Sequence, residues 1–467
     1  MKMWSGRFRQ PLDPAFERWQ RSFDFDRRLL KHELAASSAH ARALKNAGVL
    51  ASDELIAILQ GLEQVGQKAA ASSAFLEDAE AEDVHHFVEK QLVALIGDTG
   101  FKLHSGRSRN EQIATDLRLY VREAIDQLRG DLAELTGAFV NRAEQSANAA
   151  MPAYTHLQQA EPVLVAHWLL TYVEMFLRDA DRLADCRKRL NLCPLGSGAI
   201  AGATLPLDRR ALAADLGFDG PTANSMDATS DRDFALEFVN VLSVLSLHLS
   251  RWAEEMILFS SQEWGFVQLP EAYSTGSSAM PQKKNPDLLE LVRGKAGRVI
   301  GNATALLVTV KGLPLAYNKD LQETQEPVFE AAETLLAVVP LATGWMKAVE
   351  FDRERMQQAA QSGFMNAWAA ATYLVQRGVP FRLAHEFVGK AVQLALDKGC
   401  ELRDLPLEEL KKLNPVFDKD FYPCLSLESV LAIHDVPGGT APARVRQALS
   451  EAKLRIESIR EEIHAHA

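Results

Sequence analysis

One apolar pattern, between Leu117 and Phe139, constrains the fold of this chain more than any other feature. Its apolar residues are separated by 4, 4, 3, 4, 3 and 4 positions: Leu117, Val121, Ile125, Leu128, Leu132, Leu135 and Phe139. Such spacing is typical of the buried seam of a long bundled helix. A helix from Asn110 to Ala147 would be more than roughly 50 Å long at about 1.5 Å per residue. The sequence therefore predicts a fold organised around a bundle of long helices.

Four further segments have long helical patterns and extend the predicted bundle. They are Pro162 to Leu190, Phe234 to Phe259, Leu288 to Val310 and Val328 to Val349. The last segment contains Pro340, where we expect a kink because proline removes a backbone hydrogen bond. The apolar residues lie on more than one side, so these helices should also bury surface between subunits. We therefore expect a homo-oligomer.

The two ends of the chain have shorter helical patterns than its centre. The first part is interrupted by AASSA at residues 70–74, and the last part by Gly378-Val379-Pro380, Asn414-Pro415 and Pro437-Gly438-Gly439-Thr440. Few runs alternate as strands would, so the predicted class is all-α. We predict three domains: an N-terminal helical domain (1–110), a central long-helix bundle (111–352) and a small C-terminal helical domain (353–467).

The charge balance limits the partners of the chain. Acidic residues outnumber basic residues by 62 to 51, which gives a formal net charge of -11. Nucleic acid and anionic membranes should therefore be repelled, and an anionic substrate would need a local basic patch. No stretch reaches the roughly 18 uncharged apolar residues of a membrane span, so we expect a soluble, cytoplasmic protein. Scattered cysteines and the lack of a Cys/His cluster predict neither a disulfide framework nor a metal site.

A polar loop at residues 276–287, GSSAMPQKKNPD, carries the most distinctive chemistry of the sequence. It should lie between a helix that ends near Gly265 and a helix that begins near Asp287. Asn285 suits the N-cap of the second helix, and Pro286 suits its first position. Capping does not explain Gly-Ser-Ser beside Lys-Lys. A phosphate-binding P-loop is excluded, because that motif needs glycine directly before lysine and Ser or Thr after it.

This loop resembles the mobile catalytic loop of the fumarase/aspartase superfamily, whose members cleave C–N or C–O bonds and release fumarate. Four further segments resemble the argininosuccinate lyase family within it: Trp4 to Phe8, His104 to Asn110, Tyr154 to Gln158 and Leu315 to Glu323. The resemblance implies a lyase that reversibly converts argininosuccinate to arginine and fumarate by β-elimination, without cofactor or metal. It also implies a homotetramer in which three subunits build each active site.

The resemblance assigns catalytic roles to four residues: Ser277, Lys283, His156 and Glu290. Ser277 would be the base that removes a proton from the carbon next to a carboxylate, and its alkoxide would need Lys283 and backbone donors nearby. His156 would be the acid that protonates the leaving guanidinium nitrogen, and Glu290 would orient it. From residue type alone, His156 is more often a structural loop histidine, and Glu290 an ordinary helix-surface glutamate.

The resemblance also assigns residues to the two halves of the substrate. The succinate half would be held by Ser108, Arg109, Asn110, Thr155, Lys283 and Asn285. The arginine half would be held by Ser22, Tyr317 and Gln322. His85 matches a further active-site histidine whose role the sequence does not define. Ser108-x-x-Glu111 has the form of a capping box, but a cap leaves Arg107 and Arg109 unexplained. Guanidinium groups beside a helix N-terminus are suited to bidentate carboxylate binding.

One departure from the family concerns the arginine half. The family commonly has Asp-Lys after Leu321-Gln322-Glu323, and this lysine contacts the carboxylate of the arginine half. The present chain has Thr324-Gln325 instead. A neutral amide can donate a hydrogen bond but lacks the charge, which puts that contact in doubt.

Three alternatives stay open. Another fumarate-releasing lyase, such as adenylosuccinate lyase, would share the loop but should lack the Gly106 to Asn110 segment. A carboxymuconate-type cycloisomerase is a weaker alternative. A non-catalytic relative, like the lens δ-crystallins, is disfavoured because all four expected catalytic residues are present.

Overall fold

The computed structural model describes residues 9–78, 80–146 and 148–466. The segment Trp4 to Phe8, part of the family resemblance, lies outside the described residues. The chain forms two compact units, each made of three stretches of sequence. Unit 1 comprises the described residues of Met1–Gln127, Arg182–Ser243 and Arg298–Thr334, and unit 2 comprises those of Leu128–Asp181, Val244–Gly297 and Leu335–Ala467.

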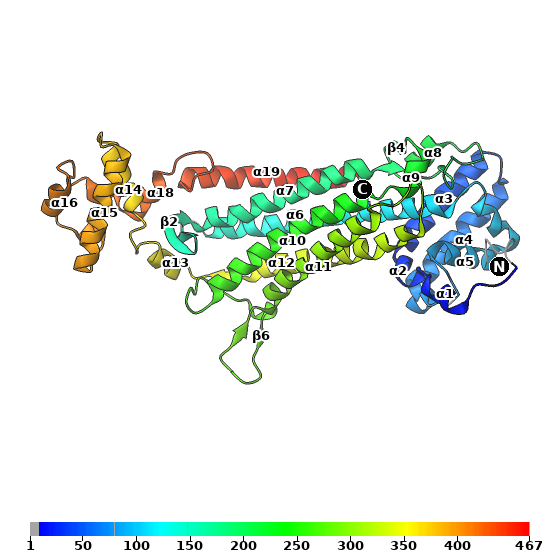
Figure 1. Ribbon diagram of the computed structural model, residues 1–467, viewed down its shortest axis with the longest axis horizontal. Coiled ribbons are helices and arrows are strands. Elements are labelled where there is room, and N and C mark those ends of the chain that lie inside the picture. Colours follow the sequence, from blue (N-terminus) through cyan, green and yellow to red (C-terminus); the bar gives the residue numbers. More distant parts are fainter. Residues whose placement is uncertain (1–8, 79, 147, 467) are drawn as a thin grey trace. The chain divides into compact units, whose positions relative to one another are not determined.

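Five long helices correspond to the five long apolar patterns, and each contains residues of both units. They are α6 (Arg109–Gln145), α7 (Val165–Leu190), α10 (Asp233–Ser260), α11 (Asp287–Val310) and α12 (Gln325–Ala348) (Figure 1). The predicted long helices are therefore confirmed. Helix α12 continues through Pro340, and the expected kink stays a prediction.

In unit 2, aromatic side chains from four helices form the centre of the bundle. The ring of Phe139 on α6 lies 5.7 Å from that of Phe176 on α7 and 6.2 Å from that of Trp252 on α10. Trp252 makes an edge contact with Trp345 on α12 at 5.3 Å. All four side chains are almost completely buried. Burial of large aromatic groups contributes strongly to the stability of such a bundle.

The C-terminal helix α19 (Pro442–His466) packs in unit 2 beside α6 and α7. Its Glu462 pairs with the buried Arg129 at 2.5 Å, and its Arg455 pairs with Glu174 at 3.1 Å. The smaller helices of this unit are α13 (Arg353–Ala359), α14 (Ala367–Val375), α15 (Phe381–Lys398), η7 (Leu402–Asp404), α16 (Leu407–Leu413), α17 (Phe421–Cys424) and α18 (Leu427–Ala432). Helices α14 to α17 share a separate apolar cluster. The division into three domains stays a prediction.

Unit 1 combines parts of the long helices with shorter ones. Its shorter helices are α1 (Pro14–Trp19), α2 (Phe23–Asp26), η2 (Arg27–Leu29), α3 (Leu30–Asn46), α4 (Ser52–Ala71), η3 (Ser73–Leu76), α5 (Val84–Ile96), η4 (Gly97–His104), α8 (Arg209–Asp215), α9 (Ser225–Ser230) and η6 (Lys319–Thr324). Phe23 stacks on Phe87 at 4.9 Å, which joins α2 to α5. Tyr120 contacts Phe329 at 4.9 Å, which joins α6 to α12. These contacts fix the helices that carry several candidate site residues.

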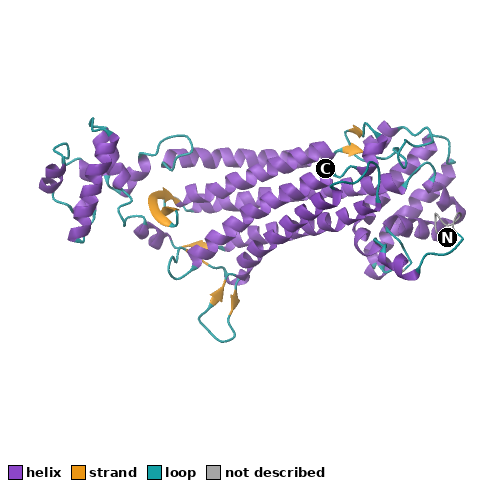
Figure 2. Ribbon diagram, viewed as in Figure 1, coloured by secondary structure: helices purple, strands orange, loops and turns teal. Residues whose placement is uncertain are grey.

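Strands occur in the described residues as four short pairs (Figure 2). The longest pair is an antiparallel hairpin of β1 (Ala150–Thr155) and β2 (Gln158–Leu164). The others are β3 (Leu192–Cys193) with β4 (Gly220–Pro221), β5 (Val267–Gln268) with β8 (Glu350–Phe351), and β6 (Thr275–Gly276) with β7 (Lys284–Asn285); η5 (Glu271–Tyr273) precedes β6. These pairs shape connections between helices, and the prediction of an all-α class is confirmed.

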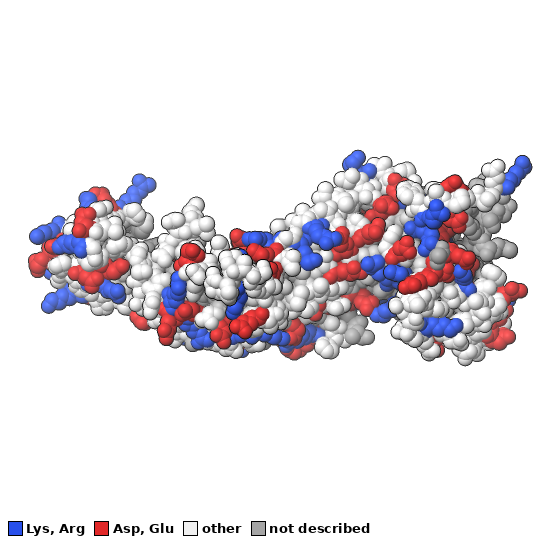
Figure 3. Space-filling model, turned by 90° about the horizontal axis from the view of Figure 1, so that it is seen from below, with Lys and Arg blue, Asp and Glu red and all other residues white. Residues whose placement is uncertain are grey.

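Two apolar stretches are long enough to cross a membrane by length and composition alone. They are Asp233–Ser260 and Lys319–Ala348. In the most apolar part of each, 56% of the residues are buried inside the protein, as is common for core helices of soluble bundles. Figure 3 shows acidic and basic side chains interspersed over one face of the molecule. A mixed surface of this kind is typical of soluble proteins.

Candidate active site

The polar loop at 276–287 forms the tip of a hairpin that extends from unit 2 (Figure 1). Strands β6 and β7 pair Thr275 with Asn285, and the residues between them are largely exposed. The hydroxyl oxygen of Ser277 accepts hydrogen bonds from the backbone N–H groups of Ala279 (3.2 Å) and Met280 (3.1 Å). Backbone donors aimed at an oxygen stabilise its anionic form. Ser278 is exposed and has no such pair among the described residues.

The two lysines of the loop have different surroundings. Lys284 lies 3.7 Å from the carboxylate of Glu271 and donates to the carbonyl oxygen of Leu269 at 3.4 Å. Lys283 is exposed, and its ammonium group forms no ion pair within the described part of the chain. Among the described residues, Lys283 is therefore the loop lysine whose charge has no carboxylate partner.

The expectation that Asn285 caps α11 is wrong. The helix begins at Asp287, where the N–H of Glu290 donates to the carbonyl oxygen of Pro286 at 3.1 Å. The amide of Asn285 instead donates across the hairpin to the carbonyl oxygen of Gly276 at 3.3 Å. Pairing between β6 and β7 thus overrides the local capping preference, and it holds Asn285 at the base of the Ser277 loop.

His156 lies in the two-residue turn of the β1–β2 hairpin. Thr155 and Gln158 face each other across the turn, and both central residues, His156 and Leu157, have positive φ angles of 55° and 58°. Such a turn favours Asn and Gly, because other side chains are strained at positive φ. Strained backbone of this kind is concentrated at functional sites. Thr155 and His156 are exposed at the tip.

The four predicted catalytic side chains make no direct polar contact with one another in the described residues. Glu290 is exposed on the first turns of α11. Among the described residues, no hydrogen bond or ion pair joins any two of Ser277, Lys283, His156 and Glu290. The proposed acid, base and charge stabiliser are therefore not linked to one another directly in the described part of the chain.

In unit 1, the predicted capping box at the start of α6 is confirmed. The N–H of Ser108 donates to the Glu111 carboxylate at 2.9 Å, and the Ser108 hydroxyl accepts from the N–H of Asn110 at 3.3 Å. Glu111 also accepts from the N–H of Gly198 at 3.0 Å. The amide of Asn110 donates to the carbonyl oxygen of Ala199 at 3.3 Å. Capping explains the conformation of Ser108 but leaves its role toward a substrate a prediction.

Both arginines of the same segment already have partners. Arg109 lies 3.0 Å from the carboxylate of Asp83. Arg107 donates to the hydroxyl of Ser37 at 2.9 Å and lies 3.9 Å from Glu33. Carboxylates of the protein therefore hold these guanidinium groups in place before any substrate binds.

Ser22 is held by a buried carboxyl group. Its hydroxyl donates to Asp26 at 2.6 Å, and the backbone N–H of Val84 donates to the other oxygen of Asp26 at 3.0 Å. Burial, followed by the nearby charge of Asp83, raises the pKa of Asp26 to about 7. Asp26 is therefore partly protonated near neutral pH.

His85 and Tyr317 lie among further buried charges. His85 Nδ1 is 2.9 Å from Glu33 and 3.6 Å from Asp116. Burial raises the pKa of Tyr317, with a smaller opposing effect from Arg232. Arg232 is almost fully buried, and two of its guanidinium nitrogens have no partner among the described residues. Burial lowers its pKa to about 10.

Gln322 donates through its amide to the carbonyl oxygen of Gln20 at 3.2 Å. Unit 1 thus contains Ser22, His85, Arg107, Ser108, Arg109, Asn110, Tyr317 and Gln322, and unit 2 contains the four predicted catalytic residues with Thr155 and Asn285.

Sequence reasoning missed the buried groups that hold these side chains. They are Asp26, Glu33, Asp83, Asp116 and Arg232. Only Asp83 had a sequence signal, because it directly precedes the Val84-His85 pair in the polar segment Glu82-Asp83-Val84-His85. Asp26, Glu33 and Asp116 are acidic residues within helices, and Arg232 lies between α9 and α10. Charged residues are exposed in most proteins, so their burial has no sequence signal.

Glu33, His85 and Asp116 are also the described residues that could each offer one atom to a metal ion, with these atoms within 4.8 Å of one another. Glu33 already accepts hydrogen bonds from Ser37 and Gln112 and lies near the cationic Arg107. These hydrogen bonds and the nearby positive charge of Arg107 leave Glu33 poorly suited to bind a cation, so the group does not fit a metal site.

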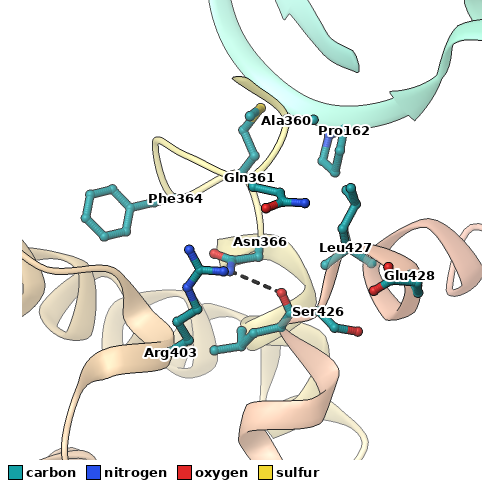
Figure 4. Close-up of a pocket in the computed structure, with 12 residues that line it drawn as sticks. Pro162, Ala360, Gln361, Phe364, Asn366, Arg403, Ser426, Leu427 and Glu428 are labelled. Atoms are coloured by element: carbon teal, nitrogen blue, oxygen red, sulfur yellow. Dashed lines mark hydrogen bonds between the residues drawn. The ribbon is translucent and has the colours of Figure 1, made fainter. Parts of the chain in front are cut away.

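A separate cavity in unit 2 has a volume of about 160 Å³ and contains none of the predicted site residues. Figure 4 shows Gln361, Asn366 and Arg403 at this cavity, where the Asn366 amide donates to the carbonyl oxygen of Leu425 at 3.4 Å. The candidate site is therefore defined by the residues above and not by this cavity.

Comparison with known proteins defines the family. A family model described as lyase matches residues 6–301, and one described as argininosuccinate lyase C-terminal matches residues 364–432. The present chain is 60% identical to the argininosuccinate lyase of Koribacter versatilis over 467 residues, and the alignment covers 100% of both chains. The chain belongs to the argininosuccinate lyase family. The argininosuccinate lyase of Acidobacterium capsulatum is also 60% identical, over 97% of this chain and 95% of the relative.

A solved structure of the superfamily supports the same assignment. EDDS lyase in complex with formate superposes with a TM-score of 0.84 at 26% identity, covering 98% of this chain and 93% of that chain. The predicted membership of the argininosuccinate lyase family is therefore confirmed. The roles of individual site residues stay predictions.

Proposed function

We propose that the protein is an argininosuccinate lyase, which cleaves argininosuccinate to arginine and fumarate by β-elimination. The observation that carries this proposal is the 60% identity, over the whole chain, to a relative named argininosuccinate lyase. The segments that distinguish this family in the sequence, including His104 to Asn110, lie inside the matched region. The chain needs neither a cofactor nor a metal in this proposal.

The proposed reaction divides between a base and an acid. The alkoxide of Ser277 removes the proton from the carbon next to a carboxylate, and the negative charge spreads into that carboxylate. The C–N bond then breaks, the C=C bond of fumarate forms, and His156 donates a proton to the departing guanidinium nitrogen. Lys283 stabilises both negative charges, and Glu290 orients His156.

The geometry of the Ser277 hydroxyl supports its role as base. A serine hydroxyl is a poor base at neutral pH unless its anion is stabilised. Two backbone N–H groups already donate to this oxygen, and the charge of Lys283 lies in the same loop. Ser278 lacks this pair of donors among the described residues and serves as the natural control.

We further propose a homotetramer with shared active sites, located in the cytoplasm. Exposed apolar side chains along α11 support association, namely Leu291, Ile300, Leu307 and Val308. Shared sites are also consistent with the lack of a hydrogen bond or ion pair between any two of the four proposed catalytic side chains in the described residues. Light scattering should give roughly 200 kDa for the active species, four times the chain mass of 51.6 kDa; an active monomer would contradict the proposal.

Shared sites also predict complementation. Inactive His156→Asn and Ser277→Ala variants, refolded together, should recover part of the activity, because some mixed sites contain neither change. Refolding each variant alone is the control and should recover none. If the mixture forms mixed tetramers and stays inactive, the two residues do not act from different subunits.

The reaction itself is tested with purified protein and argininosuccinate, by following the absorbance of fumarate. Fumarate and arginine should appear in equal amounts after metals have been removed with a chelator. Adenylosuccinate is the comparison substrate. Turnover of adenylosuccinate without turnover of argininosuccinate would overturn the proposal in favour of another lyase of the superfamily.

A further inference from the structure

The buried cluster of Glu33, His85 and Asp116 brings together three helices of unit 1. Their side chains are 1%, 2% and 0% exposed, and they come from α3, α5 and α6. His85 Nδ1 lies 2.9 Å from one Glu33 oxygen and 3.6 Å from an Asp116 oxygen. The opposite ring nitrogen, Nε2, is buried and has no hydrogen-bond partner among the described residues.

Glu33 is surrounded by donors. The hydroxyl of Ser37 donates to it at 2.6 Å, and the amide of Gln112 donates to its two oxygens at 3.1 and 3.3 Å. The guanidinium of Arg107 lies 3.9 Å away. Burial opposes ionisation, but the electrostatic attraction of His85 and Arg107 and the hydrogen bonds from the His85 ring and Ser37 outweigh it, and the pKa of Glu33 lies far below its usual range. Glu33 is therefore the ionised member of the cluster.

Asp116 has the opposite environment. No N–H or hydroxyl group of the described residues donates to its oxygens, and its side chain lies within hydrogen-bond reach of Glu33. Burial, followed by the charge of Glu33, raises the pKa of Asp116 well above its usual value. Two carboxylates this close and this deeply buried cannot both be ionised at neutral pH. Asp116 is therefore the protonated member, and the pair carries one negative charge.

An ionised carboxylate facing Nδ1 determines the tautomer of His85. Nδ1 must carry a hydrogen to donate to Glu33, so Nε2 is the nitrogen left for another partner. The ionisable groups that interact with His85 come from four elements: Asp26 of α2, Glu33 of α3, His104 of η4 and Asp116 of α6, with Arg107 behind Glu33. Glu33 is the one that makes a hydrogen bond to the ring.

We propose that Glu33 and Asp116 are positioning residues for His85 in the lyase reaction. Glu33 fixes the hydrogen of the imidazole on Nδ1, and Asp116, as a neutral acid, keeps a second negative charge out of the cluster. His85 then presents Nε2 to the substrate or to a neighbouring active-site group. This inference rests on the proposed function for its effect on turnover, but the tautomer of His85 can be measured without substrate.

The test changes one carboxyl group to an amide at each of two positions. In Glu33→Gln, the new amide N–H faces Nδ1 and forces the hydrogen of His85 onto Nε2. A carboxylate-to-amide change behind a catalytic histidine lowers kcat by about 10⁴ in the serine-protease triad. We expect kcat to fall by roughly 10²–10⁴ here. In Asp116→Asn, the amide replaces an already neutral acid, so the loss should be at least about tenfold smaller.

A direct measurement separates positioning from general disruption. Solid-state ¹⁵N NMR of protein labelled at histidine, with His85 assigned by difference from His85→Gln, reports which ring nitrogen carries hydrogen. Wild type and Asp116→Asn should both have hydrogen on Nδ1, and Glu33→Gln should have it on Nε2. Hydrogen on Nε2 alone in wild type would refute the inference even if the protein proved to have another activity.

Asp179→Asn is a matched control outside the candidate site. Asp179 is fully buried and lies 2.6 Å from Nδ1 of His248 in unit 2. This variant makes the same chemical change behind another histidine and should leave kcat within about threefold of wild type. Equal losses of kcat in Glu33→Gln, Asp116→Asn and Asp179→Asn would show that Glu33 and Asp116 have a purely structural role. If Glu33→Gln does not fold, Asp116→Asn still tests the inference. A strongly reduced kcat in Asp116→Asn, with a ¹⁵N spectrum like that of wild type, would refute the assignment of Asp116 as the neutral acid.

Discussion

Replacing Asp26 with asparagine should stabilise the protein, and should do so more at alkaline pH than at acidic pH. Asp26 is 2% exposed, and burial together with Asp83 raises its pKa from 3.8 to about 7. An asparagine can keep both hydrogen bonds, because its carbonyl can accept from the N–H of Val84 and its amide can donate to the hydroxyl of Ser22. The Asp26→Asn change would therefore remove the charge without leaving a polar group unpaired.

The direction of this pH dependence follows from the raised pKa of Asp26. A carboxyl group whose pKa is raised by folding binds its proton more tightly in the folded state, so stability is lost as the pH rises toward about 7. A rise in pKa of about 3 lowers the free energy of unfolding by roughly 4 kcal/mol at pH 8, where the group must ionise inside the protein. At pH 5 the same group lowers the free energy of unfolding by only about 1–2 kcal/mol. The advantage of Asp26→Asn should therefore grow by about 3 kcal/mol between these pH values.

Thermal unfolding at equal protein concentration measures this difference, since oligomer stability depends on concentration. The difference in Tm between Asp26→Asn and wild type should widen from pH 5 to pH 8. Asp24→Asn provides the matched control, because Asp24 lies in the same helix with its side chain 84% exposed. It should change Tm little, and equally at both pH values. An Asp26→Asn variant that is less stable than wild type at pH 8 would refute the reasoning.

Three further predictions concern the remaining parts of the site. Ser277→Ala should lower kcat by roughly 10²–10⁴ while substrate still binds, because the hydroxyl acts on the reacting proton. Ser278→Ala should lower kcat much less. Comparable kcat values for the two variants in steady-state kinetics would reject Ser277 as the base. Gln325→Lys should lower KM for argininosuccinate by about threefold to tenfold, since it restores a cation for the arginine half, and an unchanged KM would show that position 325 does not contact this half. Leu157→Gly should be more stable than Leu157→Ala by about 1 kcal/mol in chemical denaturation, because residue 157 has a φ of 58°, which glycine adopts without strain. Alanine variants are usually the more stable ones, since glycine loses more backbone entropy on folding. A more stable Leu157→Ala would show that the turn carries no strain.

The long helices could be predicted from sequence because their signal is local and repeated. The pattern from Leu117 to Phe139 specifies a buried face over many turns, and α6 contains all of it. The all-α class follows from several such patterns. The end of the polar loop was harder to predict, because Asn285 has a good local role as a cap and a different tertiary role in the β6–β7 hairpin.

The β1–β2 hairpin could not be predicted from its turn. Hairpin turns with two positive φ angles are usually marked by Asn or Gly, and here the two positions are His156 and Leu157. The sequence thus lacks the usual signal at the position where the backbone is most constrained. The family resemblance predicted the importance of His156, but the strain that fixes its direction appears only in the structure.

The buried carboxyl groups were missed for a different physical reason. An acidic residue in a helix is normally exposed, and only the tertiary fold shows that Glu33 and Asp116 are buried together beside His85. Their partners come from helices that are distant in sequence, so no spacing rule connects them. Sequence analysis therefore identified the side chains expected to contact substrate but not the groups that orient them.

These two classes of residue imply two kinds of control over the reaction. In unit 1, Ser22, His85 and Arg109 are each held by a carboxyl group before substrate arrives, so their positions cost little additional ordering on binding. In unit 2, Ser277 and His156 lie in the connecting loops of hairpins. The hydroxyl of Ser277 is half-buried and accepts from two backbone N–H groups, whereas the side chain of His156 is exposed. Substrate binding should therefore depend on the side chains that are held in unit 1, and the rate of the chemical step should depend both on His85, as positioned by Glu33, and on how the hairpin tips are ordered when the site closes.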